Sequence, residues 1–278
     1  MRITSWNLLH GMEIPPNPAG PSAPALQRAI AEIASDVIAV QEVDYLLPRT
    51  NGINQIGEIA TAMSATDWAF APSVIGTPGE KWRKLNDRDP NYVSNNSIGD
   101  LAESYGIAIA SNIPVIKWQR LDLGRSVIGM PLVVPAESET GSRPKIRAIY
   151  VRDEPRVALA ATLQNGFTVI NTHLSFVPGV NLNQLNKLKR WAQQIARETN
   201  TIPIILGDLN LPKGIPALGS KWKSLVNQNT YPSWGAKIQF DYILADDLSG
   251  YQVTDRKTVK TGVSDHLPLR IELVRTNK

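Results

Sequence analysis

The chain contains no cysteine and no long apolar run, and both absences narrow its function. Without cysteine, the chain has no disulfide, no thiolate metal site and no thiol nucleophile, as expected of a cytoplasmic protein. No apolar run approaches the roughly 18 residues that a membrane-spanning helix needs. The N-terminal residues "MRITSWN" lack the charged and apolar regions of a secretory signal. We therefore predict a cytoplasmic protein without a membrane span.

Several well-known catalytic motifs are also missing. The sequence has no G-x-S-x-G nucleophile elbow, no G-x-x-x-x-G-K-[ST] phosphate loop, no G-x-G-x-x-G fingerprint and no H-E-x-x-H zinc motif. Ser264, Asp265 and His266 are sequence neighbours, whereas the members of a catalytic triad meet only in space. These three residues therefore do not indicate a serine hydrolase.

Composition indicates a globular protein with a slight preference for anions. Of the 278 residues, 42% are hydrophobic and 19% are charged, which argues against a disordered chain. The net charge of +4 favours polyanionic partners only weakly, and from charge alone a solvated basic surface is the simpler explanation. An α/β chain of this length folds as one domain in many cases, and we predict a single domain over residues 1–278.

The hydrophobic pattern predicts many strands and few helices, interspersed along the chain. Asn165-Gly166 is a hairpin signal between two of the strands, and the stretches 13–24, 76–104 and 135–146 are predicted to be irregular. This order favours an α/β fold, in which two mixed β-sheets pack together with helices outside. The predicted helices are 25–35, 53–63 and 182–198, and the predicted strands are 2–6, 36–43, 68–74, 105–111, 115–123, 156–163, 167–174, 202–209, 240–245, 251–257 and 267–274.

Polar residues recur where these strands begin or end. A strand that carries a carboxylate, amide or imidazole at its tip holds that group on a rigid element. Taken singly, each has an ordinary explanation as a solvated strand end, a Gly-Asp turn or a buried group with a structural partner. Taken together, they favour a functional site at one edge of the fold. The residues are Asn7, Glu42, Asn171, Thr172, His173, Asp208, Asn210, Asp241, Asp265 and His266.

Oxygen ligands dominate this set. Carboxylate and amide oxygens suit Mg²⁺ or Mn²⁺, whereas zinc recruits more nitrogen or sulfur. Mg²⁺ takes one or two carboxylates from the protein and keeps other positions for water and substrate phosphate. The set therefore predicts phosphoryl chemistry with Mg²⁺ as cofactor and Mn²⁺ as the alternative. We interpret His10, which follows the first strand by several residues, as a loop histidine outside the site.

A resemblance to a known family rests on seven segments that run in order from residue 5 to residue 269. They are "SWNLLHG", "VIAVQEVD", "YGIAIAS", "INTHLSF", "IILGDLN", "FDYILA" and "VSDHLPL". In this order they resemble the endonuclease/exonuclease/phosphatase superfamily, which includes the deoxyribonucleases. The resemblance implies a four-layer α/β/β/α sandwich with the active site at one edge.

The resemblance also implies residue roles. Because a carboxylate such as Asp241 would favour the charged form of an imidazole, His266 is suited to bind phosphate and Asp208 to handle the attacking water. The implied metal ligands are Glu42, with Asn7 and Asp265 beside it; the implied catalytic residues are Asp208 for the water, Asn210 for the water or phosphate, His266 as catalytic histidine oriented by Asp241, and His173 as a second phosphate-binding histidine.

Three functions are compatible with this resemblance. The first is a Mg²⁺-dependent nuclease, either an endonuclease or an exonuclease. The second is a phosphatase or phosphodiesterase acting on a phospholipid, of the sphingomyelinase or phosphoinositide type, or on a small phosphorylated molecule. The third is a non-catalytic binding module, which we disfavour because no implied catalytic position is missing. "WNLLHG" and "NTHLS" depart from the apurinic/apyrimidinic endonuclease pattern, and "PRTNGINQIGEIA" is similar to short bacterial members.

Tryptophans and cations outside these segments have two interpretations. Trp82, Trp222 and Trp234 either fill gaps between layers or contact bases or lipid. Arg156 begins a strand and points either into the site or to solvent. A basic cluster in the predicted loop either is solvated or contacts a phosphate backbone; its members are Lys81, Arg83, Lys84 and Arg88.

Overall fold

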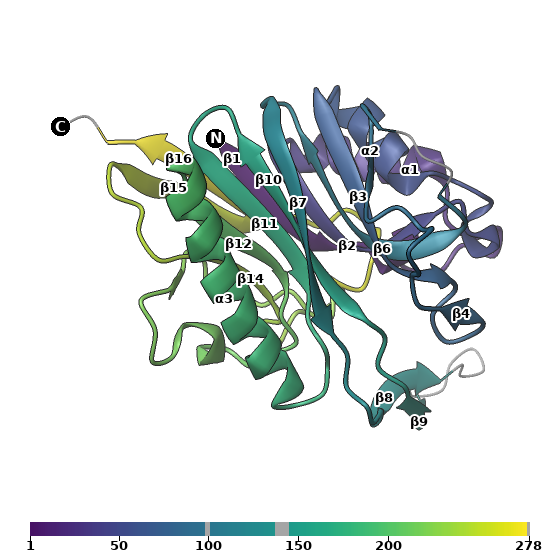
Figure 1. Ribbon diagram of the computed structural model, residues 1–278. Helices are drawn as coiled ribbons and strands as arrows, with labels where there is room; N and C mark the ends of the chain where they lie inside the picture. Colours follow the sequence, from purple (N-terminus) through teal and green to yellow (C-terminus); the bar gives the residue numbers. More distant parts are fainter. Residues whose placement is uncertain (98–100, 137–144, 277–278) are drawn as a thin grey trace.

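Two mixed β-sheets form the centre of the protein in the computed structural model, which describes residues 1–97, 101–136 and 145–276 (Figure 1). In the first sheet, β1 pairs parallel to β2 and antiparallel to β16. Its strands, in spatial order, are β15 (Tyr251–Thr258), β16 (Leu269–Arg275), β1 (Arg2–Asn7), β2 (Val37–Tyr45), β6 (Ser104–Ser111), β3 (Asp67–Gly76) and β4 (Trp82–Arg83), with β5 (Val93–Ser94) also paired to β3.

In the second sheet, β11 pairs parallel to β12, and β12 pairs antiparallel to β14. Its strands, in spatial order, are β13 (Lys223–Ser224), β14 (Asp241–Ala245), β12 (Ile202–Asp208), β11 (Phe167–His173), β10 (Arg156–Leu163) and β7 (Val115–Gly124). The helices are α1 (Ala23–Ile33), α2 (Gln55–Met63) and α3 (Val180–Thr199), and the short 3₁₀ turns are Leu9–Gly11, Pro48–Thr50 and Ile215–Ala217.

Three apolar layers hold these elements together. Ile3, Leu159 and Leu206 belong to the core between the two sheets. Helices α1 and α2 pack on the outer face of the first sheet, and α3 lies across the outer face of the second (Figure 1). Both faces of the central strands are therefore covered, which explains why their sequences are continuously apolar rather than alternating. The predicted four-layer sandwich is confirmed.

An amide pair joins the two sheets inside the apolar core. The Asn171 side chain on β11 donates 2.8 Å hydrogen bonds to the backbone carbonyls of Val40 and Ala108 in the first sheet. Gln41 in turn donates to the Asn171 Oδ1 at 2.7 Å. Buried amides of this kind must be hydrogen-bonded, so the bonds fix how the sheets sit on each other close to where β2 and β11 end.

Ser22 accepts a hydrogen bond from the Ala25 backbone N–H at 3.3 Å and caps α1, a position at which serine is preferred. Asn54 caps α2 in the same way through the Gly57 N–H at 3.1 Å.

Among the described residues, no helix is long and apolar enough to cross a membrane.

The prediction of irregular structure over 135–146 is wrong at both ends. Residues 137–144 lie outside the described residues, but 135–136 and 145–146 belong to a separate two-stranded ribbon formed by β8 (Met130–Ala136) and β9 (Lys145–Val151). The ribbon continues from the ends of β7 and β10 beyond the sandwich (Figure 1). Pro131 and Pro135 are compatible with it because each strand of such a ribbon has an unpaired edge.

The predicted long loop over 76–104 is also interrupted. It contains β4 and β5, each of two residues, which extend the first sheet beside β3. Residues 98–100 of this stretch lie outside the described residues.

Candidate active site

The predicted site residues converge where the parallel strands of both sheets end. Asn7 ends β1, Glu42 lies near the end of β2, and His173 and Asp208 end β11 and β12. His173 lies directly opposite Asp208 in the strand register, and Asp208 lies directly opposite Asp241 at the start of β14. Sheet pairing therefore places three of the predicted catalytic residues side by side.

Gly207 allows this close approach. A Cβ atom built on Gly207 would lie 1.9 Å from the Thr172 carbonyl oxygen on the neighbouring strand. Only glycine fits such a contact, so the residue before Asp208 is fixed by the spacing of β11 and β12.

Several residues around the site have left-handed backbone conformations. Glu42 has φ of 54° and lies in a bulge, where the register between β2 and β6 shifts between Val40 and Val43. Asn210 has φ of 48°, and Ser264, just before Asp265, has φ of 68°. Residues other than glycine adopt this region at a cost of about 1–3 kcal/mol, and such strain is concentrated at functional sites. The bulge gives Glu42 a direction that a regular strand would not.

His266 is held by a buried carboxylate. Its Nδ1 lies 2.8 Å from the Asp241 Oδ2, which also accepts a hydrogen bond from the Thr230 hydroxyl. Burial lowers the pKa of His266, but Asp241, Asp208 and Asp265 together outweigh it and raise the pKa to about 10. His266 is therefore an imidazolium at neutral pH, and its Nε2 faces the Asp208 Oδ2 at 3.8 Å.

His173, unlike His266, is uncharged. Its Nε2 lies 3.2 Å from the Asn210 Nδ2 and 3.7 Å from the Asp208 Oδ2. Burial, together with the positive charge of Arg156, lowers the pKa of His173 to about 3. His173 is therefore neutral at neutral pH and can contribute a hydrogen bond but no net charge. This refines the sequence-based expectation that both histidines bind phosphate.

The residues predicted to bind metal form an acidic group around Asn7. The Asn7 Nδ2 donates to the Glu42 Oε1 at 2.9 Å and to the Asp208 Oδ2 at 3.1 Å. Burial raises the pKa of Glu42 to about 7, with Asp265 and Asp208 adding to the effect. Burial also raises the pKa of Asp265. Buried carboxylates that destabilise one another's charge are stabilised by a cation, and these oxygen donors suit Mg²⁺.

A second trio, Asp208, Asp241 and His266, also has ligand atoms that lie within 4.8 Å of one another. Histidine binds metal through a neutral ring nitrogen, whereas His266 is protonated and bound to Asp241. The charge of His266 and its bond to Asp241 therefore favour hydrogen bonding over metal binding for this trio.

A pocket of about 1180 Å³ opens onto these groups. Asp241 is fully buried, and neither Asp241 nor Asp265 belongs to the pocket lining. Six predicted residues line the pocket: Asn7, Glu42, His173, Asp208, Asn210 and His266. Its walls also contain residues that the sequence analysis did not assign to the site, chiefly His10, Arg49, Tyr105 and Arg156.

His10 and Arg49 form one part of the wall. His10 lies in a 3₁₀ turn after β1, which agrees with its interpretation as a loop histidine, and this turn places it in the wall of the pocket. Burial, together with Arg49, lowers the pKa of His10 to about 3. Arg49 is bound to Asp44 by two 2.7 Å hydrogen bonds and lies over the Tyr105 ring at 5.7 Å. The segment "PRTNG" was the only sequence signal for this residue.

Arg156 points into the protein beside the pocket and not to solvent. It is 3% exposed and forms ion pairs with Asp153 at 3.2 Å and Glu154 at 3.0 Å. Its guanidinium lies 5.9 Å from the centre of the Phe176 ring. Trp222 is buried and fills a gap beneath α3, whereas Trp82 lines the pocket.

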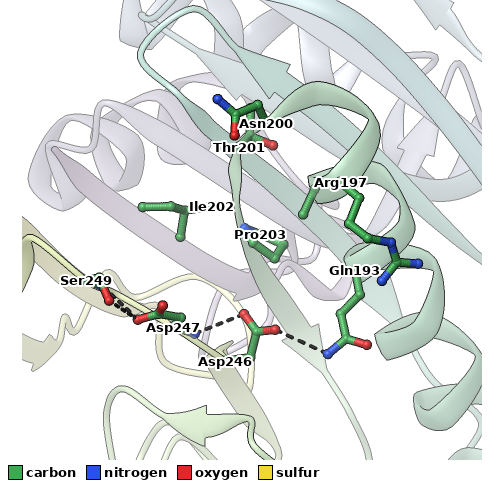
Figure 2. Close-up of a pocket in the computed structure, with 10 residues that line it drawn as sticks. Gln193, Arg197, Asn200, Thr201, Ile202, Pro203, Asp246, Asp247 and Ser249 are labelled. Carbon is green, nitrogen blue, oxygen red and sulfur yellow. Dashed lines mark hydrogen bonds between the residues drawn. The ribbon is translucent and has the colours of Figure 1, made fainter.

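A second pocket, of about 570 Å³, lies at the opposite end of β12 from Asp208. Figure 2 shows its polar groups bound to one another: Asp246 accepts from Gln193 at 3.2 Å, and Asp247 accepts from the Ser249 hydroxyl at 2.6 Å. The residues that line it include two carboxylates but no histidine, so it lacks the carboxylate–imidazole pairs of the first pocket.

Comparison with solved structures finds the same fold at low sequence identity. A protein of unknown function from Enterococcus faecalis V583 is 18% identical, with a TM-score of 0.62 over 99% of this chain and 100% of the other. The Bacteroides thetaiotaomicron mannosyl-6-phosphatase Bt3783 is 15% identical, with a TM-score of 0.59 over 99% of both chains. The human Nocturnin catalytic domain with bound sulfate is 16% identical, with a TM-score of 0.60 over 99% and 94%.

No curated protein sequence matches the chain. The sequence profile of the Endonuclease/Exonuclease/phosphatase family matches residues 4–266, which is nearly the whole chain. Members of this family are phosphoric ester hydrolases that depend on divalent metal ions. The match spans every residue of the site described above, and the chain therefore belongs to the endonuclease/exonuclease/phosphatase family and is a metal-dependent phosphoester hydrolase.

Proposed function

We propose that the protein is a Mg²⁺-dependent phosphodiester hydrolase that acts on nucleic acid. The observation that carries this proposal is the meeting of an acidic group around Glu42 with a charged His266 and a neutral His173 around one carboxylate, Asp208. Hydrolysis of a phosphodiester needs positive charge to balance the phosphate and a base to activate water. Asp208 is the base in this proposal, and the metal group and the histidines on either side of it supply the contacts to the phosphate.

Glu42, Asn7 and Asp265 would hold the metal. When bound, Mg²⁺ supplies positive charge to a phosphate oxygen and to the charge that develops during attack. Asn7 donates hydrogen bonds to both Glu42 and Asp208, so it keeps the ligand and the base at a fixed separation.

Asp208 is the group that we assign to the attacking water. Its Oδ1 accepts the Asn210 backbone N–H at 3.0 Å, and its Oδ2 accepts from Asn7. The carboxylate is therefore oriented before substrate binds, and it can accept the proton that water releases. A positioned general base of this kind contributes about 10²–10⁴-fold to rate.

His266 and His173 are assigned to the phosphate. His266 carries a positive charge fixed by Asp241, so it can donate its Nε2–H to a phosphate oxygen without losing a proton at neutral pH. His173 is neutral and lies beside Asn210, and it can contribute a hydrogen bond. Charge-assisted hydrogen bonds are roughly twice as strong as neutral ones, so we expect His266 to be the more important of the two.

A phosphatase or phosphodiesterase that acts on a phospholipid or a small phosphorylated molecule is the second candidate. The observation that favours it is an apolar wall, formed by Tyr231, Ile238 and Phe240, in the same pocket as His266. Nucleic acid is preferred because the pocket also carries Arg49, Lys81, Arg125, Arg152 and Arg156.

A substrate panel tests the proposal. Plasmid DNA, RNA, sphingomyelin and inositol phosphates are each incubated with the enzyme and Mg²⁺, with EDTA and Mn²⁺ as parallel conditions. We expect cleavage of nucleic acid, and turnover confined to a lipid or to a small ester would replace this function by the second candidate.

Two variants test the residue assignments. Glu42→Gln should abolish hydrolysis and weaken Mg²⁺ binding measured by titration calorimetry, and His266→Ala should abolish hydrolysis while Mg²⁺ binding persists. Glu32→Gln, an exposed glutamate on α1, is the matched control and should resemble the wild type. Full activity in either variant, or unchanged Mg²⁺ affinity in Glu42→Gln, would contradict the assignment.

A further inference from the structure

The active-site pocket extends well beyond the catalytic residues. Its outer part lies between the loop that precedes Trp82 and the end of β9. A single phosphate occupies only a small part of about 1180 Å³. The outer part of this pocket, which we call the mouth, is lined by Glu80, Lys81, Trp82, Arg125, Tyr150 and Arg152.

Positive charge is in excess at the mouth. Lys81, Arg125 and Arg152 are exposed, and Glu80 is the carboxylate among these mouth residues. The other cations of the predicted loop cluster are placed differently: Arg83, for example, is bound to Asp89 by hydrogen bonds of 2.6 and 2.8 Å. Within the described part of the chain, Arg125 bonds to a backbone carbonyl and an aromatic ring and to no carboxylate.

Arg125 is held in place without losing its capacity to bind an anion. Its guanidinium lies 5.8 Å from the centre of the Trp82 ring, and its Nη1 donates to the Asp153 carbonyl at 3.4 Å. Trp82 itself packs against Leu47 and Val74. A guanidinium stacked on an aromatic ring keeps most of its N–H donors available, so the mouth presents a preorganised cation.

Asp153 links this cation to the catalytic end of the pocket. The buried Asp153 carboxylate accepts hydrogen bonds from the Ser126 backbone N–H at 2.7 Å and the Ser175 hydroxyl at 2.8 Å. It also accepts from Arg156 at 3.2 Å. Arg125 and Arg156 are therefore attached to one residue, and together they line the pocket from its mouth toward His173.

We propose that Arg125, with Arg152 and Lys81, forms a second phosphate-binding subsite, and that the substrate is a single-stranded nucleic acid whose neighbouring phosphate binds there. This inference rests on the proposed function, because it places a second phosphate of the same strand beyond the one that is cleaved. Arginine matches phosphate oxygens through a rigid fork of donors. Trp82 and Tyr150 among the cations give the mixture of aromatic and basic groups that single strands bind.

The test compares one variant on two substrates. Bis(p-nitrophenyl) phosphate carries one phosphate and reports on the catalytic end alone, whereas an oligothymidylate carries several. For Arg125→Gln we expect kcat/KM on the oligothymidylate to fall about 10-fold, and kcat/KM on the single phosphate to stay within about 2-fold. Arg88→Gln, from the same basic cluster but outside the pocket, should match the wild type on both substrates.

A binding measurement makes the outcome independent of turnover. Fluorescence anisotropy of a labelled oligothymidylate in EDTA gives an affinity at several salt concentrations. Arg125→Gln should weaken binding about 10-fold and reduce the slope of log K against log salt by about 1. Arg152→Gln, at an exposed residue of the mouth, should act in the same direction. Because it leaves Arg125 and Trp82 intact, it distinguishes lost phosphate binding from a folding defect caused by the first variant.

Each result decides the question. Equal losses on both substrates would mean that Arg125 maintains the pocket and binds no phosphate, and unchanged oligonucleotide affinity in both variants would also overturn the subsite. If the wild type cleaves neither substrate, the proposed function fails, while the anisotropy measurement still decides whether the mouth binds a strand.

Discussion

Replacing Asp241 with asparagine removes one buried charge while keeping the side-chain volume. The Asp241 carboxylate is fully buried, and its Oδ2 lies 2.8 Å from the His266 Nδ1. Removing one member of a buried ion pair costs about 3–5 kcal/mol because the other charge is left without a partner. His266 limits this cost by releasing its proton, so the loss of stability depends on pH.

The direction of that dependence follows from the raised pKa. Burial lowers the pKa of His266, but Asp241, Asp208 and Asp265 raise it to about 10 in the folded protein, above roughly 6.5 for an unfolded histidine. The stabilisation is therefore fully present below about pH 6.5 and is lost as the pH rises through about 10. At about 1.36 kcal/mol per pH unit, its full value is about 4–5 kcal/mol, in agreement with the cost of breaking the pair.

Urea denaturation between pH 6.5 and 10.5 measures this difference. We expect Asp241→Asn to lower the free energy of unfolding by about 3–5 kcal/mol at pH 6.5 and by about 1 kcal/mol or less near pH 10.5. We also expect kcat/KM to fall by about 10²–10³-fold, because the imidazolium that faces the phosphate is lost.

Asp67→Asn is the matched control. Asp67 is also buried, but its carboxylate accepts the Val115 backbone N–H at 3.0 Å, and none of the ion pairs found among the described residues involves it. Its effect on stability should stay constant over the same pH range. A constant difference between wild type and Asp241→Asn would refute the assignment of His266 as a stable imidazolium.

Three further perturbations test other parts of the structure. Burial, together with Arg49, lowers the pKa of His10 to about 3, so the folded state resists a proton that the unfolded chain binds. As the pH falls from 7.5 to 5, His10→Asn should therefore gain about 1–2 kcal/mol of stability relative to wild type in urea denaturation. A difference that does not change with pH would contradict this. Gly207→Ala should lower the free energy of unfolding by about 3 kcal/mol or more and reduce activity, since its Cβ would lie 1.9 Å from the Thr172 carbonyl oxygen. Gly235→Ala, where a Cβ would have nothing within 4 Å, is the control and should be nearly neutral in thermal denaturation. Asn171→Leu should cost about 2–4 kcal/mol, because two buried backbone carbonyls lose their donor; a loss below about 1 kcal/mol would mean that the amide does not hold the sheets together.

Much of the sandwich follows from patterns visible in the sequence. Covered strands are continuously apolar, so the central strands could be located to within one or two residues. The polar tips, such as Asp208 after "IPIILG", could be identified because an apolar strand that ends in an ionisable group is uncommon without a reason. The order of the strands could not be predicted, since no local pattern specifies that His173 pairs opposite Asp208 or that Asp208 pairs opposite Asp241.

The walls of the pocket could not be predicted, because tertiary packing determines them. Arg156 begins a strand and could have pointed either way, and it turns inward because Asp153 and Glu154 are there to pair with it. The β8–β9 ribbon was missed because proline normally argues against a strand, although an unpaired edge tolerates it. Arg125 and Trp82 are more than 40 residues apart in the chain, and only the fold brings them into contact.

The two site histidines show most clearly where prediction from sequence ends. "NTHLS" and "SDHLP" each place a histidine beside a strand end, and nothing local distinguishes their charge. In the folded protein both rings are buried, and burial alone would make both neutral. His266 has the Asp241 carboxylate at 2.8 Å and becomes charged, whereas His173 lies near Arg156 and beside the Asn210 amide and stays neutral. A motif therefore supplies the imidazole, but the residue packed against it determines whether that imidazole brings charge or only a hydrogen bond to a phosphate.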